Sequence, residues 1–311
     1  MMKKLKIVFF GSGEIAIASL KMLLVTGYDV CYVVTAPDKA KGRHLKDSFT
    51  PIKVFSLEEG LNIFQPDKFN IDVCDFIKKL EPDLFVVFSY GKILPKTLLS
   101  IPKLFALNIH TSLLPRYRGA APINWVIING GEETGVSLIR MNEKMDEGDI
   151  ILKEKVKITE EDNSISLENK LSEHAVKLLK ETLAIIENDT IKFKRQSENA
   201  TYAPKLKKED GRILWNKTAR DINNQIRGCQ PWPGSFTSLE DKIIKIWKAE
   251  PIDLKDSENV GEIINIDKDG ILVATGKGGL LIKELQLASG KRLSASQFIA
   301  GHRLHPGMKF D

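Results

Sequence analysis

Short apolar runs alternate with amphipathic stretches along the N-terminal part of the chain. The run Leu5–Phe10 predicts a buried strand, and apolar residues at helical spacing over Glu14–Val25 predict a helix after it. A long amphipathic helix is predicted over 165–186. The same patterns predict strands over Val30–Thr35, Asp83–Phe88, Thr134–Met141 and Ile150–Ile158, and helices over Asp72–Leu80 and from Pro122 onward. Such alternation predicts a parallel sheet with helices on both faces.

The pattern changes after the polar stretch Arg195–Glu209, which contains Pro204 and several lysines. Beyond it, a helix over Ala219–Arg227 precedes closely spaced short strands, which predict a small β-barrel. These strands are expected over Ile243–Trp247, Val260–Ile266, Ile271–Thr275 and Leu280–Leu287. We therefore predict an α/β chain with a Rossmann-like parallel-sheet domain at residues 1–194, a linker at 195–209 and an OB-like β-barrel domain at 210–311.

The composition, 42% hydrophobic and 28% charged residues, is that of an ordinary globular protein. The three cysteines, Cys31, Cys74 and Cys229, fit neither a disulfide framework nor a zinc spacing, which favours a reducing compartment. No apolar run is long enough to span a bilayer. We expect a cytoplasmic monomer with no membrane partner. Most of the net charge of +5 comes from Lys205 onward, where the chain has 18 Lys and Arg and 14 Asp and Glu. This excess does not by itself establish a nucleic-acid partner.

Candidate chemistry begins where a predicted strand ends at Asn108 and His110. Side chains two residues apart share one face of a strand, and ligands of open α/β sheets bind at the carboxyl ends of strands. An amide and an imidazole placed there can stabilise an oxyanion and move a proton. Downstream, Met145–Asp149 brings acids on a glycine-containing turn. Taken alone, an Asn-x-His pair at a strand end is more often a turn with a structural histidine than a catalytic pair.

A competing motif, Gly11–Ala16, satisfies the Gly-x-Gly-x-x-Ala form of a dinucleotide fingerprint. That fingerprint needs an acid about 20 residues on, at the end of the second strand, and here Asp38 comes late. The basic loop after Asp38 would suit a 2′-phosphate, so an NADP-dependent oxidoreductase stays an alternative. We favour the simpler interpretation that the glycines permit a tight strand-to-helix turn. A nucleic-acid binding module without chemistry is a third class, and no histidine has the ligand spacing of a zinc hydrolase.

Several spaced segments together resemble the formyltransferase family that uses 10-formyltetrahydrofolate. The segments that carry the resemblance are Lys6–Gly11, Phe88–Pro95, Asn108–Asp149, Thr201–Leu206 and Ile226–Gly234. The last two resemble the branch of the family that formylates methionyl-tRNA. Gly13 departs from the family, whose first turn usually has fewer glycines. The resemblance implies transfer of the formyl group from 10-formyltetrahydrofolate to the α-amine of initiator methionyl-tRNA, for translation initiation and without a metal. Sugar-nucleotide amines, glycinamide ribonucleotide and water are the other acceptors in the family.

The resemblance also implies roles for individual residues. Asn108 and His110 would donate to the oxyanion, and Asp146 would favour protonated His110 and relay a proton, with Asp149 as its rival. The residues implied for the folate site are Tyr90, Ile93, Ser112, Leu113, Leu114 and Pro115. Arg43 would contact the acceptor end of the tRNA, assisted by Lys39, Lys41 and Lys46, and the basic linker and barrel would supplement these contacts.

Overall fold

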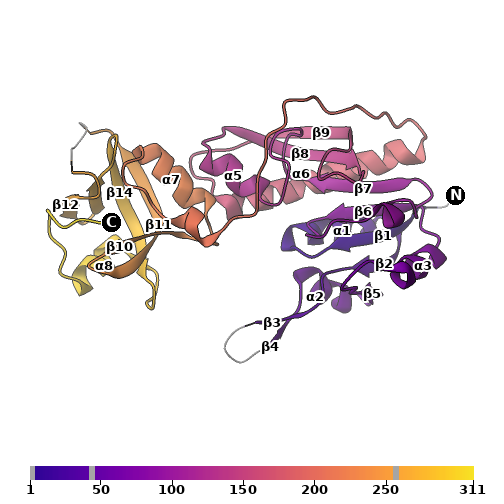
Figure 1. Ribbon diagram of the computed structural model, residues 1–311, viewed down its shortest axis with the longest axis horizontal. Coiled ribbons are helices and arrows are strands. Elements are labelled where there is room, and N and C mark those ends of the chain that lie inside the picture. The colour runs from indigo at the N-terminus through magenta and orange to yellow at the C-terminus, as the bar shows by residue number, and fades with distance from the viewer. Residues whose placement is uncertain (1–3, 42–45, 255–258) are drawn as a thin grey trace. The chain divides into compact units, whose positions relative to one another are not determined.

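The computed structural model describes residues 4–41, 46–254 and 259–311 and divides into two compact units (Figure 1). The sheet unit consists of Met1–Pro122, Glu133–Lys157 and Glu168–Ala203. The barrel unit consists of Ile123–Glu132, Ile158–Leu167 and Pro204–Asp311. The predicted domain bounds at 194 and 209 stay predictions. Within the described ranges, no helix is both long and apolar enough to cross a membrane.

Seven strands of the sheet unit form one sheet in the order β5-β2-β1-β6-β7-β8-β9. The strands are β1 (Lys6–Gly11), β2 (Asp29–Val34), β5 (Ile63–Phe64), β6 (Leu84–Phe88), β7 (Phe105–His110), β8 (Glu133–Arg140) and β9 (Asp149–Lys157). Pairing is parallel from β5 to β7, whereas β7–β8 and β8–β9 pair antiparallel. The sheet is therefore mixed, whereas a parallel sheet was predicted. The hydrophobic pattern does not encode strand direction, so it could not predict the antiparallel pairings.

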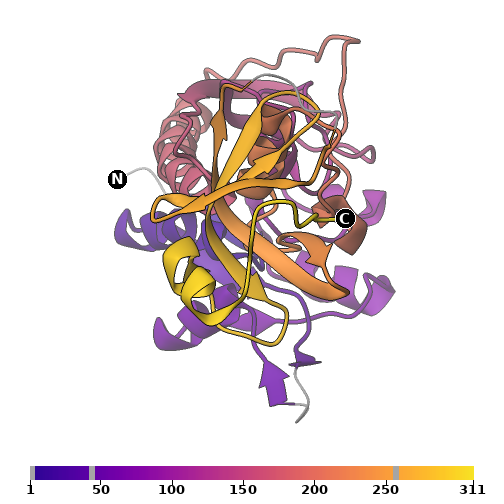
Figure 2. The same ribbon diagram turned by 90° about the vertical axis from the view of Figure 1, so that its left-hand side faces the viewer.

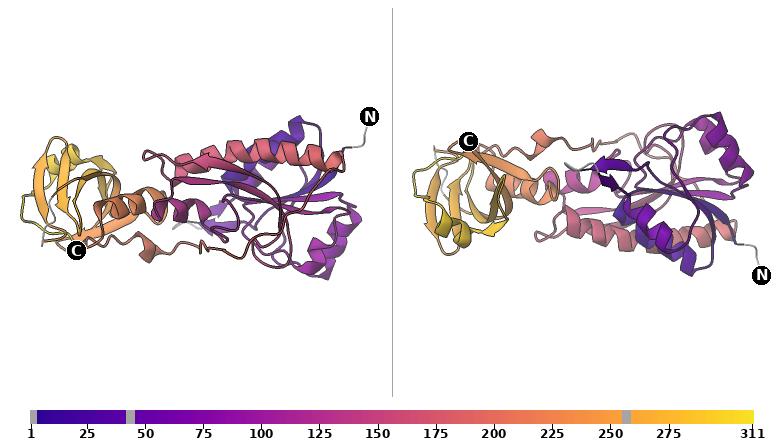
Figure 3. Two further views of the ribbon diagram at one scale, coloured as in Figure 1. Left: turned by 90° about the horizontal axis from the view of Figure 1, so that it is seen from above. Right: turned by 90° about the horizontal axis from the view of Figure 1, so that it is seen from below.

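Helices cover both faces of this sheet, with α1 and α6 on one face and α3 on the other (Figure 3). The helical elements are η1 (Glu14–Ala16), α1 (Ile17–Val25), α2 (Pro51–Glu58), α3 (Ile71–Lys79), α4 (Lys96–Leu99) and α6 (Ser164–Glu187). Helix α3 begins where the Asn70 side chain accepts from the Val73 N–H at 3.0 Å, a cap that stabilises by about 1 kcal/mol. Its Ile77 packs against Val8 and Phe10 of β1. Within these buried layers, β7 pairs with β6 on one side and with β8 on the other.

The barrel unit is built on an all-antiparallel sheet in the order β10-β11-β14-β13-β12, with β15 paired to β14 (Figure 2). Its elements are α5 (Pro122–Ile128), η2 (Lys208–Gly211), α7 (Ala219–Gly228), β10 (Ser235–Leu239), β11 (Lys242–Ile252), β12 (Ile263–Asp267), β13 (Gly270–Ala274), β14 (Gly279–Leu287), β15 (Leu293–Ser294) and α8 (Ala295–Gly301). Register shifts near Lys248 bend β11 around a core that includes Trp215 and Phe310. The predicted fold class is therefore confirmed as a Rossmann-like sheet domain and a small OB-like β-barrel domain.

Candidate active site

Three predicted catalytic side chains meet at the carboxyl end of β7. The Asn108 amide donates from Nδ2 to Asp146 Oδ1 at 3.4 Å, and His110 Nδ1 lies 3.6 Å from Asp146 Oδ2. Asn108 is half-buried and His110 is buried. Both side chains reach the same carboxylate because alternate residues of a strand share a face. The rival Asp149 is paired with Arg140 at 2.6 Å instead.

The orientation of the His110 ring is set by the backbone of Tyr117. His110 Nε2 lies 2.9 Å from the Tyr117 carbonyl oxygen, which can only accept, so Nε2 carries a proton and donates. Tyr117 has φ of +58°, a left-handed conformation that is uncommon outside glycine. The second ring nitrogen, Nδ1, is therefore the one that faces Asp146 and is available for proton exchange.

Asp146 lies on a sharp turn between β8 and β9. Its φ is +52°, and its Oδ2 accepts the Gly119 N–H at 2.8 Å. A hydrogen bond to a carboxylate is stronger than one between neutral groups, so this contact fixes the carboxylate beside His110. A side chain at Gly148 would collide with the Arg140 carbonyl, which explains the glycine two residues after Asp146.

The loop after β7, which the resemblance places in the folate site, is held by buried hydrogen bonds. Ser137 of β8 donates to the Ser112 carbonyl at 2.7 Å and accepts the Leu114 N–H at 3.1 Å. Ser112 and Leu114 are fully buried, and Leu114 packs on Ile139 and Ile150. Leu113 and Pro115 remain half-buried. Any ligand contact of this loop must therefore come from its backbone, Leu113 or Pro115.

Tyr90 and Ile93 follow β6 and differ in exposure. Ile93 is 70% exposed, whereas Tyr90 is buried against Phe10 and Phe69. The phenol oxygen of Tyr90 has no hydrogen-bond partner among the described residues. Burial raises the pKa of Tyr90 to about 12, so the phenol stays protonated and keeps a donor for a ligand.

Two backbone donors of the glycine-rich turn at Gly11–Ala16 are in use within the protein. The N–H groups of Ser12 and Gly13 both donate to the Ser89 carbonyl, at 3.1 and 3.2 Å. A side chain at Gly13 would collide with Ser89 Oγ, so close approach of the two segments explains this glycine. Asp38 accepts from Gln65 at 3.0 Å and pairs with Lys53, and these hydrogen bonds hold the pKa of its carboxyl below the usual range. Two N–H groups of the fingerprint turn and the acid that follows the second strand are thus engaged within the protein.

We therefore expect NADH and NADPH not to bind to the purified protein. A titration followed by nicotinamide fluorescence, up to millimolar nucleotide, should show no saturable change. Binding of a folate analogue to the same protein preparation, measured by calorimetry, is the positive control. Saturable binding of either nucleotide would restore the oxidoreductase alternative.

The basic residues assigned to tRNA binding lie on a short hairpin and on the segment that follows its first strand. Strand β3 (Lys39–Lys41) pairs antiparallel with β4 (Lys46–Ser48), with Lys41 opposite Lys46. Arg43 lies outside the described residues. The roles of all four residues stay predictions.

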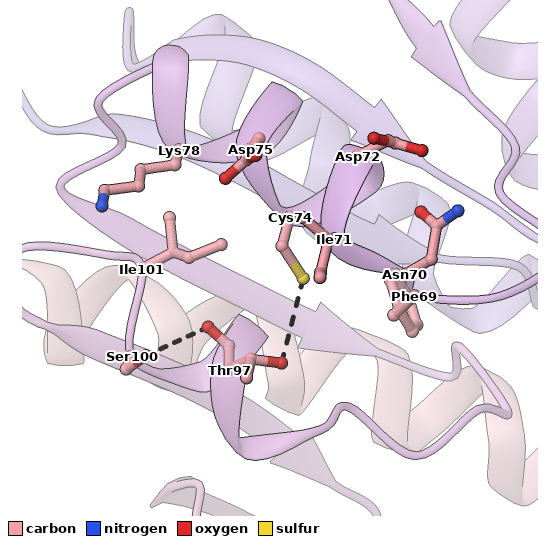
Figure 4. A pocket seen from close by; sticks show the side chains of 10 residues that line it. All are labelled: Phe69, Asn70, Ile71, Asp72, Cys74, Asp75, Lys78, Thr97, Ser100 and Ile101. Atoms are coloured by element: carbon pink, nitrogen blue, oxygen red, sulfur yellow. Dashed lines mark hydrogen bonds between the residues drawn. The ribbon is translucent and has the colours of Figure 1, made fainter.

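A separate pocket of about 830 Å³ lies between α3 and α4 (Figure 4). Phe69, Cys74 and Thr97 are among its lining residues, and none of the predicted catalytic or folate residues is. In the part of the chain that the structure describes, no three His, Cys, Asp or Glu side chains gather closely enough to hold a metal ion.

Sequence reasoning missed the backbone groups that complete this site. The Tyr117 carbonyl and the Gly119 N–H contact His110 and Asp146, and Gln196 contacts the turn that carries Asp146. Tyr117 and Gly119 stand in a segment that the resemblance covers. Gln196 stands in a polar stretch whose pattern gave no signal of function.

The family pattern described as formyl transferase matches residues 5–183, and its C-terminal domain matches residues 205–303. The chain belongs to the formyl transferase family. Among its relatives in this family, the methionyl-tRNA formyltransferase of Clostridioides difficile (strain 630) is 43% identical over 306 residues, covering 98% of this chain and 99% of that protein. The methionyl-tRNA formyltransferase of Citrifermentans bemidjiense is 44% identical over 308 residues, covering 98% and 96%.

Two solved structures share the fold of this chain at low sequence identity. The N-formyltransferase from Helicobacter canadensis, in complex with folinic acid and dTDP-3-aminofucose, superposes with a TM-score of 0.68 at 19% identity and covers 93% of this chain and 100% of that one. HypX from Aquifex aeolicus, in complex with tetrahydrofolic acid, superposes with a TM-score of 0.63 at 16% identity over 98% of this chain. This chain spans 51% of the length of that HypX chain.

Proposed function

We propose that this chain transfers the formyl group of 10-formyltetrahydrofolate to the α-amine of initiator methionyl-tRNA, giving N-formylmethionyl-tRNA for translation initiation. The observation that carries the proposal is the 43% identity to a methionyl-tRNA formyltransferase along 98% of the chain. The meeting of Asn108, His110 and Asp146 at one strand end supports the chemistry. Because all three side chains come from one unit, a monomer would suffice for the reaction. Translation initiation would place the reaction in the cytoplasm.

The reaction begins when the neutral α-amine attacks the formyl carbon and a tetrahedral oxyanion forms. The Asn108 amide has two N–H donors, and only one of them is directed to Asp146, so the second is free for the oxyanion. A proton on His110 Nδ1 can be shared between Asp146 and the substrate, because 3.6 Å is too long for a committed hydrogen bond. Donors fixed before the reaction stabilise developing charge at little reorganisation cost.

Collapse of the intermediate breaks the bond between the formyl carbon and the folate nitrogen. The attacking nitrogen loses a proton and the leaving folate nitrogen gains one, so the step needs a proton carrier rather than a net acid or base. Asp146 would help to relay this proton, directly or through water, and its negative charge would favour the protonated form of His110. The product amide and tetrahydrofolate then leave.

Substrate contacts follow from the same proposal. Leu113, Pro115, Ile93 and Tyr90 would contact the folate co-substrate. Apolar walls with a few polar groups suit a flat pterin ring. The β3–β4 hairpin, with Arg43 beyond its described part, would hold the acceptor end of the tRNA through phosphate and base contacts.

The test is an acceptor comparison with 10-formyltetrahydrofolate labelled in the formyl group. We expect label to appear on initiator methionyl-tRNA, and elongator methionyl-tRNA to receive much less. A sugar-nucleotide amine, glycinamide ribonucleotide and water alone should receive little label. Faster transfer to one of these acceptors would contradict the proposal.

A parallel measurement separates the folate site from the acceptor. A saturating, non-reactive folate analogue should raise the unfolding temperature, because a ligand that binds only the folded state stabilises it. An analogue that gives no thermal protection would count against the folate pocket, whatever the acceptor.

A further inference from the structure

A glutamine closes the turn on which Asp146 lies. The Gln196 side chain donates from Nε2 to the Asp146 carbonyl at 2.7 Å and to the Gly148 carbonyl at 2.8 Å. One amide nitrogen thus uses both of its hydrogens to join the two sides of the turn. Asp146 is in the left-handed region, which costs a non-glycine residue roughly 1 kcal/mol or more and persists only where neighbours enforce it. Gln196 supplies that enforcement.

A buried arginine fixes which way the glutamine amide points. Arg118 donates from Nε and Nη2 to Gln196 Oε1, at 3.2 and 2.9 Å. The two backbone carbonyls can only accept and the guanidinium can only donate, so the amide has one acceptable orientation. Arg118 is 7% exposed, and its Nη1 pairs with Glu147 Oε1 at 3.0 Å, on the same turn. Gln196 therefore binds the backbone of the turn, and Arg118 binds its Glu147 side chain.

The segments that carry these two residues are themselves paired. Arg118 N–H donates to the Thr201 carbonyl at 2.8 Å, and Ala203 N–H donates to the Arg118 carbonyl at 2.7 Å. The Tyr117 N–H donates to Thr201 Oγ1 at 2.8 Å. Tyr117 and Gly119 in turn contact His110 and Asp146. Gln196, Thr201 and Ala203 therefore support the segments that contact both the histidine and the aspartate.

We propose that Gln196 is a positioning residue for the formyl transfer proposed above, on which this inference rests. It holds Asp146 at its separation from His110 and Asn108, and it touches neither substrate. A misplacement of about 1 Å in a catalytic group costs about 10²-fold in rate. Loss of the glutamine therefore slows the chemical step and leaves substrate affinity almost unchanged.

The experiment compares Gln196→Met with wild type by steady-state kinetics. Methionine has a similar length but cannot donate to the two carbonyls. We expect kcat to fall by about 10- to 100-fold, with KM for folate and for tRNA within about twofold of wild type. Thr190→Ala, at an exposed position just after α6 and outside the linker, is the control and should keep wild-type kinetics.

A second variant, Gln196→Glu, distinguishes a loss of positioning from unfolding of the protein. Glutamate keeps the size of the side chain and an acceptor for Arg118, but it places an oxygen against both carbonyls. We expect the same loss of kcat with an unfolding temperature close to that of wild type. A rescue of kcat by this variant would show that only the Arg118 contact matters and would overturn the proposal.

The remaining outcomes are also decisive. A wild-type protein that formylates no acceptor refutes the proposed function, not the positioning role. If the wild type is active, two results would refute the positioning role. One is a folded Gln196 variant whose kcat stays within twofold of wild type. The other is a rise in KM that accounts for the whole loss of kcat/KM. The positioning role is equally refuted if both variants unfold below the assay temperature, since Gln196 would then be a general stability requirement.

Discussion

Replacement of His110 by alanine is expected to lower kcat for formyl transfer by about 10²- to 10³-fold, the loss of roughly 2.7–4 kcal/mol that follows removal of one donor to an oxyanion. The imidazole lies 3.6 Å from Asp146 and is oriented by the Tyr117 carbonyl, so no other described side chain takes its place. Steady-state kinetics with methionyl-tRNA and 10-formyltetrahydrofolate would measure the change.

His174→Ala is the matched control, because His174 pairs with Glu154 rather than with Asp146. It should retain wild-type kcat. Thermal unfolding of both variants would separate a catalytic loss from a folding defect, since His110 is buried. Near-normal formylation by a folded His110→Ala protein would make the catalytic assignment wrong.

The second large effect is expected from Arg43→Ala, which should lower kcat/KM for initiator methionyl-tRNA by about 10- to 100-fold, or about 1–3 kcal/mol. The arginine would stack on, or hydrogen-bond to, an unpaired base at the acceptor end, as proteins do with splayed nucleotides. Folate binding should not change, because the folate site is assigned to other residues.

Lys79→Ala, which removes an exposed positive charge from α3, is the control for a general electrostatic effect. It should change kcat/KM for tRNA only slightly at physiological salt. An unaltered kcat/KM in Arg43→Ala under the same conditions would remove the hairpin from the tRNA interface and leave the catalytic assignment standing.

The elements that the sequence predicted best are those whose burial is periodic and continuous. The apolar stripe over 165–186 is α6, Ser164–Glu187, and Leu5–Phe10 is β1, Lys6–Gly11. Strand β10 was missed because its inward side chains, such as Ser235 and Thr237, are polar. Thr237 is satisfied by Trp215 Nε1 and by the Asp311 carbonyl, and a periodicity argument cannot foresee partners so distant in sequence.

In the candidate site too, the sequence predicted some residues and missed others. Strand periodicity placed Asn108 and His110 on one face, and the resemblance selected Asp146 over Asp149. The supporting contacts run through backbone groups of Tyr117 and Gly119, whose positions depend on tertiary packing rather than on residue type. Gln196 was read as part of a linker because polar residues without periodicity are typical of one. Its partners lie 50 and 78 residues away along the chain.

The barrel unit includes two stretches that come earlier in the chain, 123–132 and 158–167. Asn124 donates from Nδ2 to the Gly228 carbonyl at 2.8 Å, and a side chain at Gly228 would press on Ile128. Arg227 donates from Nη1 to the Asp162 carbonyl at 2.7 Å. A fragment that begins at residue 204 would thus contain α7 but lack the residues of 123–132 and 158–167 that α7 contacts. Recombination with a relative could move this module only by exchanging three separate stretches of the gene together.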